Sequence, residues 1–194
     1  MRQTRRFCLA SASPRRKELL AQLGLTFEVA PTDEDETRLP GEAPPAYSLR
    51  IAENKARSAL ARFPDHLILA GDTVVVLGEE MLGKPATPGE ATEMISRLSG
   101  KTHRVISAYF LLDGPSGEHC EGISETRVMF RSLPPEWIAW YGGLPEAQDK
   151  AGAYAIQGVG GAMVERIEGS YATVVGFPTD AILWDLVRKG WVKL

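Results

Sequence analysis

From the start of the chain, short apolar runs alternate with longer stretches in which the apolar residues recur at the spacing of a helix. Residues 7–10 form an apolar run that predicts a first strand, and residues 27–31, FEVAP, predict a second. Leucines at helical spacing between them predict a helix that begins at Pro14, because Ser13 can cap it and proline suits the first helical position. Gly24 is placed to end this helix.

The middle of the chain predicts two helices and one buried strand. A proline-rich loop at residues 38–47 precedes a long amphipathic helix, whose apolar positions span residues 49–63. Residues 67–77, LILAGDTVVVL, are apolar almost throughout, which is typical of a strand covered on both faces. A capping-box pattern at residues 87–90 starts a helix that runs to Leu98.

The last third of the chain predicts further strands and two more helices. Two long strands flank a turn at residues 114–118, and a short helix follows near residues 134–141. The segments AMVERI and SYATVVGF, residues 162–167 and 170–177, predict a hairpin pair. A closing helix directs four apolar residues inward: Ile182, Leu183, Leu186 and Val187.

Composition and order of elements together indicate one globular domain spanning residues 1–194, of the α/β class with a mixed sheet. The net charge of -3 argues against a nucleic-acid binder. The apolar runs are too short to span a bilayer and the N-terminus lacks a signal-peptide pattern, so we expect a cytoplasmic protein. Cys8 and Cys120 show no framework spacing, and no metal-binding pattern of cysteines and histidines occurs.

A basic cluster marks the start of the first predicted helix. Arg15, Arg16 and Lys17 fall in its first turn, where positive side chains oppose the helix dipole. The arrangement becomes favourable if an anion binds there, because the backbone N–H groups, Ser11, Ser13 and the guanidinium groups would converge on a phosphate. The alternative is a solvated basic turn that pairs with surface acids.

Carboxylates occur in two contrasting settings. The acidic run from Asp33 to Glu36 follows a predicted strand and is typical of a solvated loop. Asp72 lies inside an apolar strand, where a carboxylate must be paired, hydrogen-bonded or metal-bound. With the basic cluster, these acids suggest Mg²⁺ or Mn²⁺ and a polyphosphate, although a structural role for Asp72 in capping a turn remains an alternative.

The segment GEEMLGKP, residues 78–85, resembles a P-loop but lacks its chemistry. Proline stands where the motif needs Ser or Thr, and no helix is predicted to begin at Lys84. We therefore interpret Gly78 as part of a hairpin turn and Lys84 as a single charge that could reach a phosphate. Lys55, in the middle of a predicted helix, is compatible with an ordinary exposed lysine.

Seven motifs in one order give the chain a specific resemblance. They are LASASPRRKELL near the N-terminus, AENKA at 52–56, GDTVV at 71–75, GKP at 83–85, LSGKTHRV at 98–105, DKAGAYAIQG at 149–158 and GSYATVVGFP at 169–178. Together they resemble the Maf family of nucleoside triphosphate pyrophosphatases, and DKAGAYAIQG resembles the branch that acts on dTTP and UTP.

The resemblance implies hydrolysis of a nucleoside triphosphate to its monophosphate and pyrophosphate, with a divalent cation, Mg²⁺ or Mn²⁺. It implies an elongated mixed sheet flanked by helices, in two lobes with a central cleft similar to inosine triphosphate pyrophosphatases, and it suggests a homodimer. The residues it implies are Asp72 as proton acceptor, Arg15, Thr73 and Gln157 for substrate choice, and Glu36, Lys55, Lys84, Asp149 and Lys150 near metal and phosphates. Together with the basic helix start, this assigns the phosphates to Ser11, Ser13, Arg16, Lys55, Lys84 and Lys150, and the metal to Glu36, Asp72 and Asp149.

Within this resemblance Gln157 would read the base. Its amide offers a donor beside an acceptor, which matches the edge of uracil or thymine, but a flipped amide would match cytosine. Preference for UTP and dTTP over CTP therefore requires a neighbour that fixes the amide, such as Thr73 or a backbone group. The family often reads Gly-Ala-Asp-Thr where this chain has Ala70-Gly71-Asp72-Thr73, which concerns only the local strand geometry.

Three other functions stay open from the sequence. One is a pyrophosphatase for 7-methyl-GTP or other modified nucleotides. A second is a regulatory binding protein, since the family name is tied to inhibition of septum formation. A tRNA or DNA binder is least favoured, because the chain has no basic stripe beyond its start.

Overall fold

The computed structural model describes all 194 residues, which fold into two compact units. Unit 1 consists of Met1–Asp72, Ser107–Ser124 and Gly176–Leu194, and unit 2 consists of Thr73–Ile106 and Glu125–Val175. Three strands contribute residues to both units: β4 (His66–Leu77), β6 (Thr102–Asp113) and β7 (His119–Phe130). The single domain predicted over residues 1–194 stays a prediction.

The main sheet has seven strands in the order β3-β2-β4-β6-β7-β8, with β5 paired to β4. Strand β2 (Arg6–Leu9) runs parallel to both β3 (Phe27–Val29) and β4. Strand β5 (Glu80–Leu82) runs antiparallel to β4, and strand β8 (Val164–Glu168) runs antiparallel to β7. This mixed sheet with flanking helices confirms the predicted α/β class, whereas the two-lobed cleft and the likeness to inosine triphosphate pyrophosphatases stay predictions.

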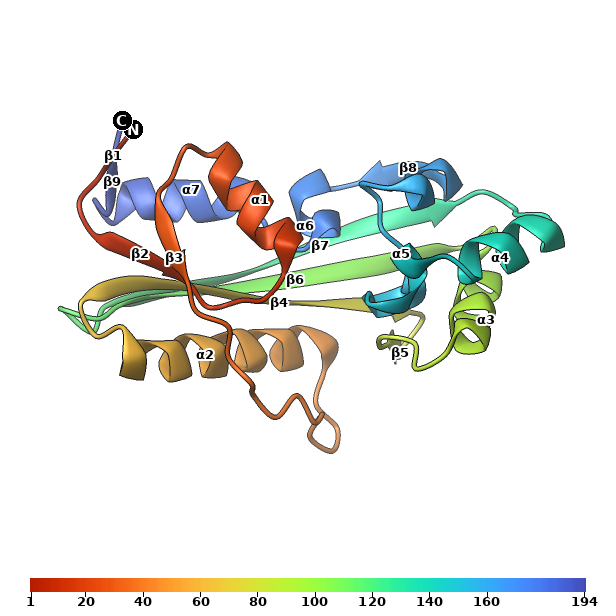
Figure 1. Ribbon diagram of the computed structural model, residues 1–194, viewed down its shortest axis with the longest axis horizontal. Helices are drawn as coiled ribbons and strands as arrows, with labels where there is room; N and C mark the ends of the chain where they lie inside the picture. Colours follow the sequence, from red (N-terminus) through yellow and green to blue (C-terminus); the bar gives the residue numbers. More distant parts are fainter. The chain divides into compact units, whose positions relative to one another are not determined.

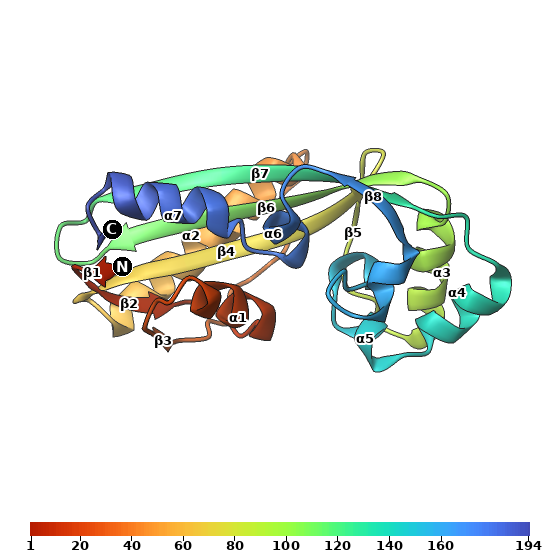
Figure 2. The same ribbon diagram turned by 90° about the horizontal axis from the view of Figure 1, so that it is seen from above.

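In unit 1 helices cover both faces of the sheet. Helix α2 (Pro44–Arg62) lies on one face, and α1 (Pro14–Gln22) and α7 (Thr179–Arg188) lie on the other (Figures 1 and 2). Three fully buried alanines of α2 pack against the strands: Ala52, Ala56 and Ala59. Because alanine is small, α2 can approach the sheet closely and bring its polar residues near the strand that carries Asp72.

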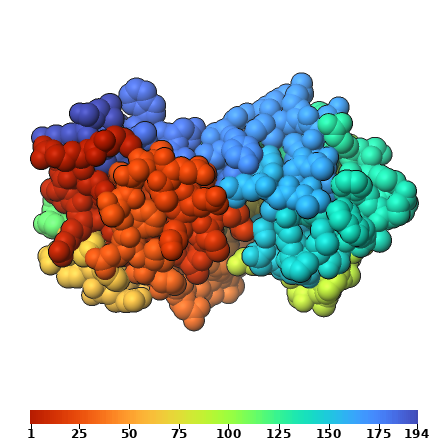
Figure 3. Space-filling model, turned by 45° about the horizontal axis from the view of Figure 1, so that its top comes forward, coloured from red at the N-terminus to blue at the C-terminus, as the bar shows by residue number.

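The two chain ends meet in unit 1. Strands β1 (Arg2–Gln3) and β9 (Val192–Lys193) form a separate antiparallel pair. Figure 3 shows the red N-terminal and dark blue C-terminal residues next to one another on the surface. Helix α7 precedes β9 directly, and its Ile182 and Leu186 are fully buried, while Leu183 and Val187 are only half-buried.

The predicted helix boundaries hold where short polar signals define them. Ser13 caps α1 by accepting a hydrogen bond from the Arg16 backbone N–H, and Gly24 follows this helix with a φ of 70°. Thr87 caps α3 (Pro88–Leu98) by accepting a bond of 3.2 Å from the Glu90 backbone N–H. These contacts span at most a few positions, so the local sequence is enough to specify them.

Two of the predicted elements are wrong. Residues 44–47, expected in the proline-rich loop, form the first turn of α2, because prolines at the first helical positions fit a helix and lack only N–H groups that would be unpaired there. Residues 170–177, expected as a strand, contain the short helix α6 (Tyr171–Val175). Strand β8 pairs with β7 instead of with this segment.

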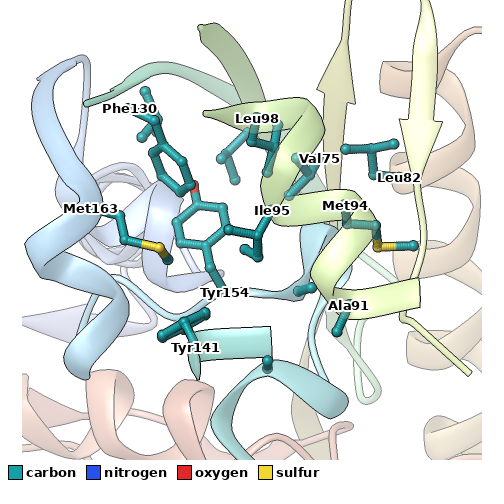
Figure 4. Packing of buried hydrophobic residues seen from close by; sticks show 14 residues of the cluster. Val75, Leu82, Ala91, Met94, Ile95, Leu98, Phe130, Tyr141, Tyr154 and Met163 are labelled. Carbon is teal, nitrogen blue, oxygen red and sulfur yellow. The ribbon is translucent and has the colours of Figure 1, made fainter. Parts of the chain in front are cut away.

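Unit 2 is built around an aromatic and aliphatic core. Besides α3 and α6 it contains helices α4 (Pro135–Gly142) and α5 (Pro145–Gln148) and the 3₁₀ turns η1 (Ala151–Ala153) and η2 (Val159–Met163). The rings of Phe130 and Tyr154 lie edge to face with centroids 4.8 Å apart, and Ile95, Met163 and Tyr141 surround them (Figure 4). This core anchors the chain on both sides of residues 155–158.

His103 is the polar exception within the core of unit 2. Its side chain is 1% exposed, Nε2 lies 2.8 Å from the Tyr154 hydroxyl, and Nδ1 has no hydrogen-bond partner. A doubly protonated ring would therefore leave one N–H group buried and unpaired. Burial lowers the pKa of His103 to about 4.

This buried histidine predicts a loss of stability in mild acid. The unfolded chain binds a proton at His103 near the ordinary pKa of 6.5, while the folded chain binds it only near 4, so stability falls as pH drops between these values. From pH 7 to pH 5, His103 should remove about 2 kcal/mol from the free energy of unfolding. Urea titrations at both pH values should show a correspondingly smaller loss for His103→Gln. Equal losses in both proteins would contradict this role.

Candidate functional site

An ammonium group between two carboxylates forms the centre of the polar site in unit 1. Lys55 Nζ donates a hydrogen bond of 2.9 Å to Asp72 Oδ1 and lies 2.7 Å from Glu36 Oε1. Asp72 comes from β4, Lys55 from α2 and Glu36 from the loop between β3 and α2. The structure thus brings together three predicted site residues that are far apart in the sequence.

Burial makes Asp72 unlike a surface carboxylate. The Asp72 and Lys55 side chains are each 11% exposed, whereas Glu36 is 47% exposed and open to solvent. Burial raises the pKa of Asp72, and the positive charges of Lys55 and Arg16 oppose this shift. A buried carboxylate with a partner and a raised pKa is a typical feature of a site that exchanges protons.

Tyr47 supports Glu36 and was missed from the sequence. Its hydroxyl donates a 2.8 Å hydrogen bond to the backbone oxygen of Glu36, and its ring is buried in the first turns of α2. Burial and the nearby carboxylates Asp72 and Glu36 raise the pKa of Tyr47 to about 12, so the hydroxyl stays a donor. Because residues 38–47 were interpreted as a loop, no local pattern pointed to an inward tyrosine here.

The start of α1 places its basic residues differently from one another. Arg16 is buried, donates from Nε to the Gly176 carbonyl at 2.9 Å, and donates from Nη1 to Ser11 Oγ at 3.3 Å. Ser13 caps the helix, Arg15 is half-buried, and Lys17 is exposed. Only Arg16 of the three cations therefore turns into the protein.

Arg16 is electrostatically linked to the carboxylate site. Burial lowers the pKa of Arg16, and the charges of Asp72 and Glu36 counteract this effect. Its hydrogen bonds to Ser11 and to the Gly176 carbonyl fix the guanidinium plane. Unit 1 therefore holds two buried cations, Arg16 and Lys55, around two carboxylates.

The remaining predicted site residues belong to unit 2. Thr73 is half-buried. It follows Asp72 in β4, and because successive side chains of a strand alternate, it points to the face of the sheet opposite that of Asp72. Lys84 is exposed in the loop after β5, and no helix begins at it. Gly78 has a φ of 63° and joins β4 to antiparallel β5, which confirms the hairpin turn predicted here in place of a P-loop.

Asp149 and Lys150 form a neighbouring ion pair in unit 2. Lys150 Nζ donates to Asp149 Oδ1 at 2.5 Å and to the Glu146 carbonyl at 2.9 Å. The Lys150 side chain is 13% exposed and that of Asp149 is 67% exposed. The structure therefore pairs these two residues with each other, and their roles toward metal and phosphate stay predictions.

Gln157 is exposed on a turn flanked by buried backbone. Ala155 and Gly160 on either side are buried, while Gln157 itself faces solvent. The surrounding glycines lie close to other parts of unit 2, since a Cβ atom at Gly158 would sit 1.8 Å from Glu146 Oε2. The small residues here make room for a side chain of the protein itself.

The donor set in unit 1 fits a hard divalent cation only in part. Glu36 and Asp72 supply carboxylate oxygens about one ammonium group, but nowhere in the chain do three or more candidate metal-ligating side chains cluster. Mg²⁺ is commonly held by one or two carboxylates together with substrate phosphates and water. The two carboxylates therefore fit a cation that arrives with a phosphate ligand.

Comparison with known proteins identifies the family. A model of the Maf-like protein family matches residues 6–188. The chain belongs to the Maf family. A protein of Syntrophus aciditrophicus named dTTP/UTP pyrophosphatase is 43% identical over 187 residues, which cover 96% of this chain and 91% of the relative.

Two other similar proteins carry the same name. The dTTP/UTP pyrophosphatase of Anaeromyxobacter dehalogenans strain 2CP-1 is 50% identical over 188 residues, 96% of this chain and 95% of the relative. That of Myxococcus xanthus is 49% identical over 183 residues, 94% of this chain and 91% of the relative. The similarity of this Maf chain to both thus extends over nearly the whole length of each protein.

The order of small residues before Asp72 has a packing reason in this Maf protein. A Cβ atom at Gly71 would lie 2.9 Å from the Ala108 carbonyl oxygen and 2.9 Å from the Phe177 ring. Ala70 is fully buried but has room for its methyl group. Position 71 therefore requires glycine here. The exchanged order of Ala70 and Gly71, compared with the order frequent in the family, leaves the strand at Asp72 intact.

None of the helices has the length and apolar character needed to span a membrane.

Proposed function

We propose that this Maf protein hydrolyses dTTP and UTP to the nucleoside monophosphate and pyrophosphate. Support comes from relatives with this name that are 43–50% identical over nearly the whole chain. The observation that carries the chemistry is the buried Asp72 carboxylate hydrogen-bonded to Lys55, with Glu36 and Arg16 around it. Paired cations suit a triphosphate, and a buried carboxylate suits a proton acceptor.

In the proposed reaction one water attacks the α-phosphorus. The bond from this phosphorus to the oxygen bridging to the β-phosphorus breaks, and pyrophosphate leaves. The Asp72 carboxylate accepts the proton of the attacking water, which requires its ionised form. Lys55 and Arg16 favour that form through their positive charge, while burial opposes it and makes the carboxylate a stronger base.

The phosphates of the substrate would meet the cations of this chain. In unit 1, Arg16 and Lys55 offer buried positive charge, and Ser11 and Ser13 offer hydroxyl groups at the start of α1. Lys84 and Lys150 of unit 2 are assigned to phosphates on the basis of the family resemblance. Positive charge held in place before the reaction stabilises the negative charge that develops on the leaving pyrophosphate.

We also propose that Glu36 and Asp72 hold a divalent cation, Mg²⁺ or Mn²⁺. The metal role proposed for Asp149, a residue of unit 2, rests on the family resemblance alone. Such a cation polarises phosphate oxygens and lowers the pKa of a bound water. Because Lys55 contacts both carboxylates, binding of the cation would require the ammonium to move toward the phosphates.

We propose in addition that the protein is cytoplasmic and forms a homodimer.

Base recognition is assigned to Gln157, with Arg15 and Thr73 as further residues of substrate choice. The exposed Gln157 amide is accessible to a ligand. Its paired donor and acceptor match the edge of uracil or thymine when the amide has one orientation.

A nucleotide panel tests this function. Pyrophosphate release with Mg²⁺ or Mn²⁺ should show kcat/KM for UTP and dTTP about tenfold to a hundredfold above that for CTP, because a mismatched pair of hydrogen bonds costs about 1–3 kcal/mol. GTP and 7-methyl-GTP serve as purine controls. Equal kcat/KM for all pyrimidines would contradict recognition by an oriented amide, and a preference for 7-methyl-GTP would replace the proposed substrate.

A further inference from the structure

The turn that carries Gln157 is closed at its base by backbone hydrogen bonding. The Gly158 N–H donates to the Ala155 carbonyl at 3.4 Å, which places Ile156 and Gln157 at the two central positions. Ala155 is buried and Gln157 is exposed. The position of the backbone that carries Gln157 therefore depends on what holds residues 155 and 158–160.

The carboxylate of Glu146 holds the side of the turn that follows Gln157. It accepts a hydrogen bond from the Val159 backbone N–H at 3.2 Å and another from the Gly160 N–H at 2.9 Å. Gly158 brings the backbone so close that an added Cβ would lie 1.8 Å from Glu146 Oε2. The glycines and the successive N–H groups thus form a cradle for an anion, and the anion in it is Glu146.

The hydroxyl of Tyr141 holds the side of the turn that precedes Gln157. It accepts a hydrogen bond of 3.2 Å from the Ala155 N–H and donates one of 2.8 Å to Glu146 Oε1. The Tyr141 ring is fully buried, and burial together with the bond to Glu146 raises its pKa. One hydrogen-bonded pair of side chains therefore clamps both ends of the turn.

We propose that Tyr141 and Glu146 are positioning residues for base recognition, because they fix the turn on which Gln157 is displayed. This inference rests on the proposed function, in which the Gln157 amide discriminates between pyrimidines. An amide can discriminate only if its backbone is held in one place, since a shift of about 1 Å weakens an oriented contact severely. Neither side chain belongs to the proton-transfer site of unit 1, so the clamp should act on substrate choice.

Glu146→Gln is the decisive variant. The side chain keeps its size, but one carboxylate oxygen becomes an NH₂ group, which cannot accept a hydrogen bond. Oε1 accepts from the Gly160 N–H and the Tyr141 hydroxyl and Oε2 accepts from the Val159 N–H, so the single amide oxygen cannot keep all three bonds. We expect the ratio of kcat/KM for UTP over CTP to fall about tenfold, mainly through a higher KM for UTP. A general weakening of the fold would lower turnover of both nucleotides equally.

Tyr141→Phe removes the hydroxyl that bonds to Ala155 and Glu146 and keeps the buried ring. This variant therefore tests the same inference if Glu146→Gln does not fold. It should lower the same ratio. The double variant should be no worse than the more severe single variant, because both act through one hydrogen-bonded unit. Additive losses would overturn the clamp.

Two controls separate this inference from the proposed function. Glu136→Gln, an exposed glutamate of α4, should leave the UTP/CTP ratio unchanged, and Gln157→Ala should abolish the preference. If the wild-type protein shows no preference for UTP, recognition by Gln157 itself is refuted. If wild type prefers UTP and Glu146→Gln retains the full ratio, only the positioning role is overturned.

Amide hydrogen exchange gives a readout independent of activity. In Glu146→Gln at least one of the N–H groups of Val159 and Gly160 should exchange faster than in wild type, while the amides of β6 residues 102–106, which belong to unit 2, stay unchanged. Unchanged exchange at both amides would overturn the positioning role of Glu146.

Discussion

Replacing Asp72 with asparagine is expected to lower turnover of UTP and dTTP by about 10²–10⁴-fold, the usual contribution of a general base. Asparagine keeps the shape of the side chain but cannot accept the proton of the attacking water. The Lys55 ammonium retains its contact with Glu36, so the surroundings of the site stay occupied. Pyrophosphate release under saturating nucleotide measures the loss in kcat.

Stability separates this chemical effect from misfolding. Since burial raises the pKa of Asp72, its charged form is disfavoured in the folded protein, and a neutral asparagine should unfold no more easily than wild type. Asp113→Asn is the matched control, because Asp113 is a fully buried carboxylate that pairs with Arg5 in the same unit. That variant should lose stability and keep kcat. Near wild-type kcat in folded Asp72→Asn would remove Asp72 from the role of base.

Lys55→Met should both destabilise the protein and reduce activity. Without the ammonium, Asp72 remains buried beside Glu36 and loses its hydrogen-bonded partner, and Arg16 is left as the cation near both carboxylates. This loss should cost about 3 kcal/mol of the free energy of unfolding. The loss of a fixed cation at the phosphates should lower kcat/KM by about 10²–10³-fold. Urea unfolding and pyrophosphate release measure the two effects separately.

Divalent cations provide the sharper test of the same variant. If Glu36 and Asp72 bind Mg²⁺, millimolar Mg²⁺ should stabilise Lys55→Met more than wild type, because the cation takes the place of the ammonium. The double variant Lys55→Met/Asp72→Asn should regain stability without activity and lose this response. Lys189→Met, which breaks a partly exposed pair with Glu118, is the control and should change stability by less than about 1 kcal/mol. An equal Mg²⁺ effect on all variants would refute the metal site.

Some elements followed from local signals and others did not. The caps at Ser13 and Thr87 and the turn at Gly78 depend on contacts within a few residues, so their patterns were sufficient. The segment SYATVVGF has β-branched residues, yet it forms α6 between Gly169 and Gly176, whose φ angles are 130° and 116°. Strand propensity depends on having a partner strand, and here β8 already pairs with β7.

The residues of the candidate site divide in the same way. Asp72 was recognisable because a carboxylate in an apolar strand needs a partner. That the partner is Lys55, interpreted from the sequence as compatible with an exposed lysine, depends on α2 packing against β4 through small alanines. Tyr47 and Glu146 carried no motif, because each acts through backbone groups distant in the sequence.

By itself the sequence determined the α/β class, the helix caps, the buried carboxylate and the ordered motifs of the Maf family, because these depend on neighbouring residues or on residue identity. Tertiary structure alone decided which charges meet. It placed Lys55 between Glu36 and Asp72, and it filled the glycine-rich cradle of residues 158–160 with Glu146. Small residues in a sequence indicate that another part of the protein lies close to the backbone there. Which side chain that is depends on how segments distant in the sequence pack together.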